Sequence, residues 1–155
     1  MLLWDWFFDG FSNGSLVASK ELLEEVCQRG KKDVASRLIE TLDQDGLLRV
    51  LTSNSDTFAH IAGIEAFVRE HFEPQHADVF LRGKDGLLIA LAKTHRVGII
   101  TLERYGVPQF NSATGKIKGK VPLPYVAWAF GVRCISLFQA FLDLPQKETA
   151  GSRVG

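Results

Sequence analysis

Hydrophobic residues along the chain form two kinds of pattern, short continuous runs and stretches with helical spacing. Continuous apolar runs are typical of buried strands, whereas apolar residues three or four positions apart indicate a helix with one buried face. The runs predict strands at residues 15–18, 47–51, 97–101 and 132–136. The spacing predicts helices at residues 2–11, 19–30, 34–42, 55–71, 87–92, 122–130 and 138–144, with a long loop at 104–120. This alternation predicts an α/β fold with three αβα layers and a short, mostly parallel sheet.

The length and composition fit one globular domain. Its 155 residues are expected to form a domain over residues 1–145, followed by a flexible polar tail at 146–155. No run of 18 apolar residues occurs, and the start lacks a basic segment, so neither a membrane span nor a signal peptide is expected. The two cysteines, Cys27 and Cys134, are expected to be buried thiols in a reducing, cytoplasmic environment.

Three carboxylates are candidates for a shared site at the strand ends. Glu103 follows the strand at 97–101, Asp85 begins the buried helix before that strand, and Glu25 lies on the flank of the helix at 19–30. Ligands of parallel sheets gather at the carboxyl ends of the strands, and three carboxylates there suit a divalent cation that activates water. Each also has a simpler explanation, since Asp85 could cap its helix and Glu25 and Glu103 could be solvated surface charges.

Three lysines of the expected loop form the clearest candidate nucleic-acid contact. The formal net charge is zero, so a nucleic-acid site must depend on a local patch or on metal ions. Lys116, Lys118 and Lys120 are set among glycines beyond Glu103, which is compatible with a flexible loop contacting RNA phosphates, or with an ordinary solvated loop.

The aromatic residues at 4–11 are expected to pack in the core or to face a partner protein or a second copy.

Several of these segments resemble the PIN domain family. The run from Asp85 to Ala92, followed by a strand ending in Thr101-Leu102-Glu103, resembles the family's second half, where an Asp opens an apolar helix and the next strand ends in Thr-x-Asp/Glu/Asn. Residues 22–26 resemble its hydrophobic-x-x-Glu-hydrophobic helix, with Glu25 at the matching position. The resemblance extends from Trp4 to Leu144, and three further segments are similar to a little-characterised bacterial PIN-like branch: 4–6, 120–122 and 131–134.

The resemblance implies a ribonuclease that uses Mg²⁺ or Mn²⁺, often the toxin of a VapC-type toxin–antitoxin pair. By that analogy Asp85 would be a main metal ligand, Glu25 would bind metal or orient water, and Glu103 would complete the cluster. Thr101 would support the acids through its hydroxyl. The implied partners are RNA, an antitoxin protein and a second copy of the chain in a homodimer.

The chain departs from the PIN pattern at its start. A PIN domain opens with an apolar strand that ends in an Asp, and no such strand precedes residues 4–6. Without it the metal would lose one ligand, and the strands at 15–18 and 97–101 would expose unpaired backbone edges. We therefore expect a truncated or inactive nuclease as one outcome, and two alternatives stay open. One is a non-catalytic PIN-like module that binds protein or RNA, and the other is a different parallel-sheet enzyme acting on small phosphorylated substrates.

Overall fold

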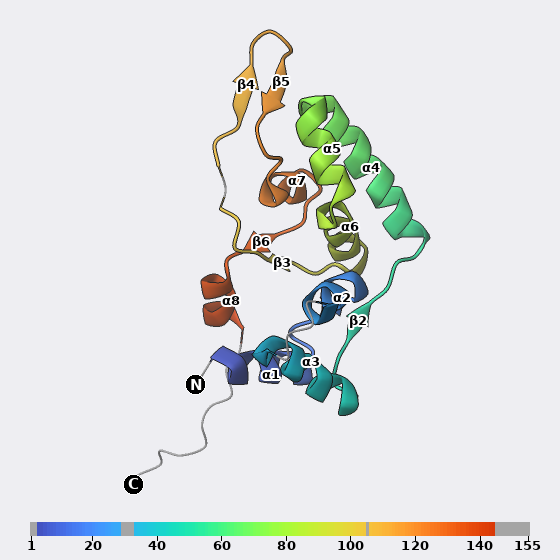
Figure 1. Cartoon of the computed structure of the whole chain (residues 1–155), viewed down its shortest axis with the longest axis vertical. Coiled ribbons are helices and arrows are strands. Elements are labelled where there is room, and N and C mark those ends of the chain that lie inside the picture. Colours follow the sequence, from blue (N-terminus) through green and yellow to red (C-terminus); the bar gives the residue numbers. More distant parts are fainter. Residues whose placement is uncertain (1–2, 29–32, 105, 145–155) are drawn as a thin grey trace. The chain divides into compact units, whose positions relative to one another are not determined.

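The chain folds into helices and short strands, a mixed α/β architecture (Figure 1). The computed structural model describes residues 3–28, 33–104 and 106–144. Contacts divide the chain into two compact units, one formed by Met1–Val50 with Phe138–Gly155 and the other by Leu51–Leu137. Each unit is described by itself. The tail predicted at 146–155 lies outside the described residues.

Within its described residues, the first unit contains four helices and a short strand. They are α1 (Leu3–Ser12), β1 (Ala18–Ser19), α2 (Lys20–Gln28), α3 (Val34–Gln44) and α8 (Leu137–Asp143). The predicted cap of α2 is confirmed, because the Ser19 hydroxyl accepts the backbone N–H of Leu22 at 3.2 Å. The carboxylate of Asp33 caps α3 in the same way, accepting the N–H of Ser36 at 2.9 Å.

Trp6 is the centre of the first unit's core. Its side chain is buried, and its ring lies 5.0 Å from that of Phe7 and 5.6 Å from that of Phe141 on α8. A Cβ at Gly10 would lie 2.6 Å from a methyl carbon of Leu16, so a larger residue there would require the Leu16 side chain to shift. The aromatic segment is thus partly core, as expected, although Trp4 is exposed.

The second unit contains the helices α4 (Ser55–His71), α5 (Pro74–Arg82), α6 (Asp85–His95) and α7 (Leu123–Ala129). Its strands are β3 (Ile99–Ile100), β4 (Gln109–Asn111), β5 (Lys116–Lys118) and β6 (Cys134–Ile135). The helix predicted at 87–92 is confirmed as buried, with four consecutive residues from Ile89 to Ala92 in the core. The hydroxyls of Thr57 and Thr94 lie 3.0 Å apart and connect the start of α4 to the end of α6.

The predicted sheet is confirmed only in part. All four predicted strands overlap observed ones, which are β1, β2 (Val50–Leu51), β3 and β6, but each of these four has only two residues. In the described residues, β1 pairs with β2, β3 with β6 and β4 with β5, so separate two-stranded sheets replace one continuous sheet. The β3–β6 pair is parallel, with Ile99 opposite Cys134.

Two predictions about loops are wrong. No helix was predicted between residues 71 and 87, but α5 lies there and begins at Pro74, a position where proline loses no helical hydrogen bond. The loop expected at 104–120 contains the antiparallel hairpin of β4 and β5, in which Phe110 pairs with Ile117. Among the described residues, no helix has the length and apolar character needed to cross a lipid bilayer.

Candidate functional site

The site begins where β3 ends. Thr101 continues the pairing of β3, because its N–H donates to the carbonyl of Ile135 at 3.0 Å. Its hydroxyl accepts the backbone N–H of Glu103 at 3.1 Å and so closes a local turn. Glu103 is thereby held beyond the carboxyl end of the parallel pair, as the sequence pattern predicted.

Both carboxylate oxygens of Glu103 have partners. Oε1 accepts a hydrogen bond from the Lys120 ammonium, and Oε2 accepts the backbone N–H of Leu123 at 3.0 Å. Burial acts to raise the pKa of Glu103, but these two hydrogen bonds outweigh it and lower the pKa below its ordinary value. Glu103 is therefore a carboxylate at neutral pH, not the freely solvated loop acid that its sequence position also allowed.

Asp85 joins this cluster from α6. It is the first residue of the helix, where the helix dipole favours a negative charge, and it is half-buried. The pKa of Lys120 is raised by its hydrogen bond to Glu103 and also by the charge of Asp85. Asp85 and Lys120 line the same cavity of about 390 Å³, together with His76 and Phe80. Lys120 thus binds Glu103 directly, shares a cavity with Asp85 and feels the charge of both acids.

Cys134 is a neighbour of the site that sequence patterns did not reveal. It lies on β6, the partner strand of β3, and its side chain is half-buried. Burial, followed by the charge of Glu103, raises the pKa of the Cys134 thiol to about 11. The thiol is therefore protonated at neutral pH and is a poor nucleophile. The expectation of two buried thiols is wrong for Cys27, which is exposed.

Glu25, the third predicted acid, belongs to the first unit. It lies on α2 with its side chain exposed. Its neighbour Glu24 forms an ion pair of 3.7 Å with Lys20 on the same helix. Asp85 and Glu103 belong to the second unit. The part assigned to Glu25 by the PIN resemblance stays a prediction.

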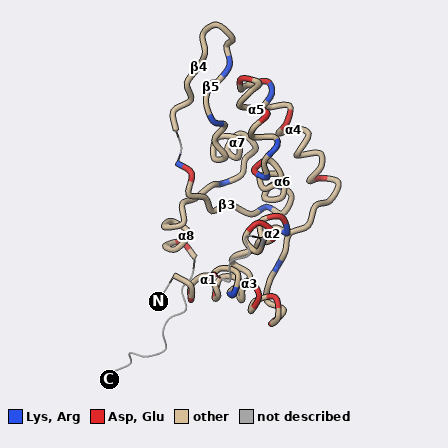
Figure 2. Tube along the Cα trace, in the orientation of Figure 1, with Lys and Arg blue, Asp and Glu red and all other residues tan. Residues whose placement is uncertain are grey.

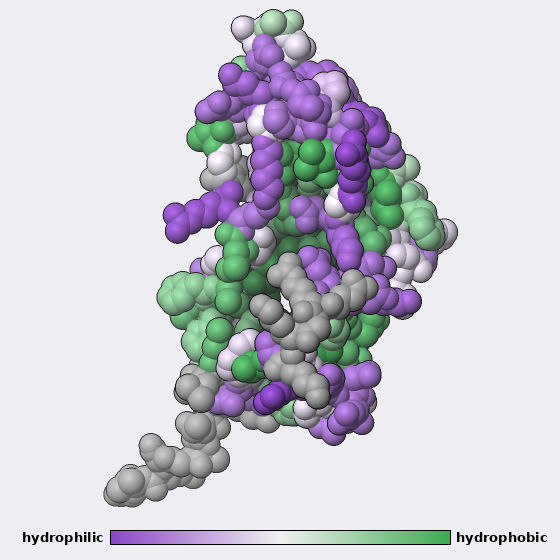
Figure 3. Space-filling model, viewed as in Figure 1, coloured by the Kyte–Doolittle hydropathy of each residue, from purple (hydrophilic) through white to green (hydrophobic). Residues whose placement is uncertain are grey.

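The three predicted RNA-contacting lysines have different surroundings. Lys116 donates to the backbone carbonyl of Arg69 at 2.9 Å, and Lys120 binds Glu103. Lys118 is exposed on β5, on the opposite side of the strand from the buried Ile117. Charged positions of both signs gather where α4 meets α5, whereas the charged positions of β5 are basic (Figure 2). The surface over this part of the chain is mostly hydrophilic (Figure 3).

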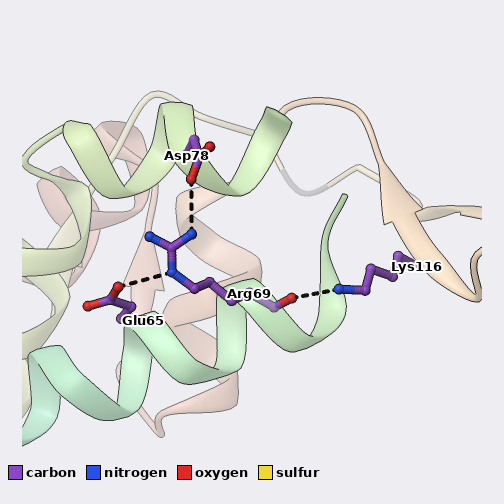
Figure 4. Close-up of polar contacts among 4 residues, drawn as sticks. All are labelled: Glu65, Arg69, Asp78 and Lys116. Atoms are coloured by element: carbon purple, nitrogen blue, oxygen red, sulfur yellow. Dashed lines mark hydrogen bonds and ion pairs between the residues drawn. The ribbon is translucent and has the colours of Figure 1, made fainter. Parts of the chain in front are cut away.

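Arg69 connects the carboxyl end of α4 to α5 and the hairpin. Its guanidinium donates to Glu65 at 3.0 Å and to Asp78 at 2.9 Å, while its carbonyl receives Lys116 (Figure 4). The hydrogen bonds to Glu65 and Asp78 raise the pKa of Arg69. Lys116 is therefore engaged by this network, just as Lys120 is engaged by Glu103.

The hairpin is also attached through Glu73, at the junction of α4 and α5. The Asn111 side-chain amide donates to Glu73 at 2.6 Å, and the Glu73 backbone N–H donates to the carbonyl of Ile117 at 3.0 Å. Phe72, fully buried, forms an isolated bridge with Ile117. A segment with these contacts is an ordered support for Lys118 rather than a flexible loop.

A second cavity lies at the other end of the parallel pair. It has a volume of about 590 Å³ and includes Gly98, just before β3, and Arg133, just before β6. The other charged residues or histidines that line it are Asp56, His60, Lys93 and Arg96. Lys93 donates to the carbonyl of Phe130 at 2.8 Å, so one of these cations already has an internal partner. Sequence patterns gave no signal for this cavity, since its residues come from three separate segments, 56–60, 92–98 and 131–133.

Clusters of His, Cys, Asp and Glu side chains are the groups that could hold a metal ion. Among the described residues, no group of three or more His, Cys, Asp or Glu side chains could hold a metal ion. Mg²⁺ usually binds proteins through one or two carboxylates, and waters and substrate phosphates complete its shell. Asp85 and Glu103 match that smaller set in number and type, and the ammonium of Lys120 already binds one of them, Glu103.

Comparisons with known proteins gave one family. Residues 1–147 match the family described as "Domain of unknown function (DUF4411)". Comparisons with curated proteins and with solved structures each found no match.

Proposed function

The chain belongs to the DUF4411 family, and we propose that it is a metal-dependent endoribonuclease of PIN-like type, acting in the cytoplasm. The observation that carries this proposal is that Lys120 binds Glu103 beyond the end of β3 and lines a cavity with a second acid, Asp85. Two carboxylates that share one cation are the kind of site that a divalent metal ion occupies in phosphodiester hydrolysis.

Each residue of the cluster has a distinct part in the proposed reaction. Asp85 and Glu103 would hold Mg²⁺ or Mn²⁺, and the bound ion would activate water and stabilise the charge that builds on the phosphate. The N–H of Leu123 and the turn closed by Thr101 hold the Glu103 carboxylate in its orientation. Lys120, as a cation beside both acids, would pair with a phosphate oxygen of RNA.

RNA is the proposed substrate because basic groups lie close to the acids. Lys118 is exposed on the attached hairpin, two residues before Lys120 in the chain. Glu103 follows β3 on the other arm that leads into this hairpin. A phosphate backbone that contacts Lys118 could therefore extend toward Asp85 and Glu103, and it needs no strongly basic protein overall.

The test is cleavage of single-stranded RNA by the purified chain with Mg²⁺ or Mn²⁺. We expect cleavage that EDTA abolishes and that the substitution Asp85→Asn reduces by at least about a hundredfold, since one carboxylate ligand is lost. A well-folded wild-type chain that leaves RNA intact with both metals would overturn the proposal. Hydrolysis of phosphomonoesters without effect on RNA would instead favour an enzyme of small phosphorylated substrates.

We further propose that the chain is the toxin of a toxin–antitoxin pair. Leu102 and Val107, on either side of Glu103 in the sequence, are 85% and 92% exposed. An apolar segment of an antitoxin bound there would cover these side chains and block access to the acids. Expression of the wild-type chain alone should arrest bacterial growth, and Asp85→Asn should relieve the arrest. A second copy of the chain is the competing occupant, which a dimer in solution would indicate.

A non-catalytic PIN-like module that binds RNA or protein is the second candidate. The specific observation in its favour is that both oxygens of Glu103 are already engaged by Lys120 and Leu123. In such a module Glu103 and Lys120 would form a structural ion pair. RNA binding that persists in EDTA, without cleavage under any metal, would support this candidate.

A further inference from the structure

We infer that Lys120 acts as a built-in competitor of the metal ion, so that its ammonium must leave Glu103 before a divalent cation can bind fully. The inference rests on the proposed metal site and concerns how that site is regulated. It follows from where the ammonium lies, how exposed its side chain is and what else holds Glu103.

The ammonium of Lys120 binds one acid of the proposed site, and Lys120 lines a cavity with the other. It binds Oε1 of Glu103, and the charge of Asp85 acts on it as well. A divalent cation bound to the same Glu103 oxygen would lie within a few ångströms of this ammonium, and the two positive charges would repel each other. Metal and lysine are therefore alternatives at Oε1.

Lys120 can leave without disturbing the core. Its side chain is 75% exposed, whereas that of Glu103 is 28% exposed. The stem of a lysine has four rotatable carbons, and the residue before it, Gly119, has a φ of 97° in a region that favours glycine. An anion such as an RNA phosphate could therefore draw the ammonium away from Glu103 by a local movement.

Glu103 keeps its orientation when Lys120 is gone. Oε2 still accepts the N–H of Leu123 at 3.0 Å, and the Thr101 hydroxyl still holds the turn. Removing the ammonium should therefore free one carboxylate oxygen in a site that stays formed. Lys116 cannot replace it, since its own ammonium is bound to the carbonyl of Arg69.

The experiment is Mn²⁺ binding to the full chain, measured by calorimetry and by the loss of the free-ion paramagnetic resonance signal. We compare the wild type, Lys120→Met and a matched control, Lys118→Met, which removes an equal charge from an exposed position on β5. Lys120→Met should bind Mn²⁺ about tenfold tighter than the wild type or more, and Lys118→Met should match the wild type. Adding Asp85→Asn to Lys120→Met should remove the gain. Circular dichroism confirms that each variant folds.

The other outcomes separate the inference from the proposed function. Equal Mn²⁺ affinity in the wild type and Lys120→Met, lost on Asp85→Asn, would overturn the inference and leave the metal site standing. An equal gain in Lys118→Met would show a general charge effect and would also overturn it. No Mn²⁺ binding by any folded variant would overturn both the inference and the proposed metal site.

Discussion

The backbone N–H of Leu123 donates to Oε2 of Glu103 at 3.0 Å and joins the first residue of α7 to the turn that follows β3. This bond holds the Glu103 carboxylate in place beyond the end of β3. It also leaves Oε1 facing Lys120. Because the backbone N–H of Leu123 binds Oε2, Oε1 is the oxygen of Glu103 that is available to a cation.

Replacing Glu103 by Gln should lower stability in a pH-dependent way. The carboxylate's folded-state pKa is depressed, so its contribution is present above its ordinary pKa of about 4.3 and is lost as pH falls through the folded-state value. We expect Glu103→Gln to lose roughly 0.5–1 kcal/mol at pH 7, a modest value because Lys120 is mostly exposed. Urea denaturation from pH 3 to pH 7 measures this. A deficit that stays constant down to pH 3 would contradict it.

Removing the hydroxyl of Thr57 should weaken the contact of α4 with α6. Thr57 is fully buried, forms a capping box with Asn54 and lies 3.0 Å from the Thr94 hydroxyl. Thr57→Val should therefore cost about 1–2 kcal/mol in the free energy of unfolding. Thr41→Val is the control, since that hydroxyl bonds only the exposed Arg37 carbonyl of its own helix. Equal losses in the two variants would argue against the capping role.

The β4–β5 hairpin should show ordered amide groups. The pairing of residues 109–111 with 116–118 and the Asn111–Glu73 hydrogen bond of 2.6 Å predict slowed hydrogen exchange there. Asn111→Ala should speed exchange in the hairpin and leave α6 unchanged. Exchange in the wild type as fast as in an unfolded peptide would show that this segment is the flexible loop that its sequence suggests.

The two cysteines should differ in alkylation. Cys27 is exposed, whereas Cys134 is half-buried and has a pKa of about 11. Iodoacetamide at pH 7.5 should therefore modify Cys27 first, and modification of Cys134 should rise only as pH approaches its pKa. In the variant Cys27→Ser, the only cysteine left is Cys134, so mass spectrometry of this variant measures the alkylation of Cys134 alone. Rapid alkylation of Cys134 at neutral pH would contradict the burial and the neighbouring Glu103 charge.

Local patterns in the sequence were sufficient to predict most helices. The apolar run at 87–92 predicted the buried part of α6, and Ser19 predicted the start of α2, because both depend on residues close together in the chain. The helix that begins at Pro74 was not predicted, because proline both interrupts helices and begins them. The hairpin was missed although Lys116-Ile117-Lys118 alternates with the period of a strand, a signal that three residues make weak.

The candidate site could be predicted residue by residue but not as an arrangement. Asp85 and Glu103 stood out because each borders an apolar element that leads to a strand end. The pairing of Glu103 with Lys120 joins positions 17 residues apart through the intervening hairpin, and no periodicity encodes it. Lys120 was therefore predicted to contact RNA, whereas its observed partner is an acid of the site.

The most direct test of the central claim is the rate of RNA cleavage as a function of Mn²⁺ concentration in three proteins. They are the wild type, Asp85→Asn and a matched control, Asp56→Asn, which changes an exposed acid in the first turn of α4. The account predicts saturable, Mn²⁺-dependent cleavage in the wild type and the control, and its near-complete loss in Asp85→Asn. Equal cleavage by Asp85→Asn and the wild type, or none by a folded wild type, would contradict it.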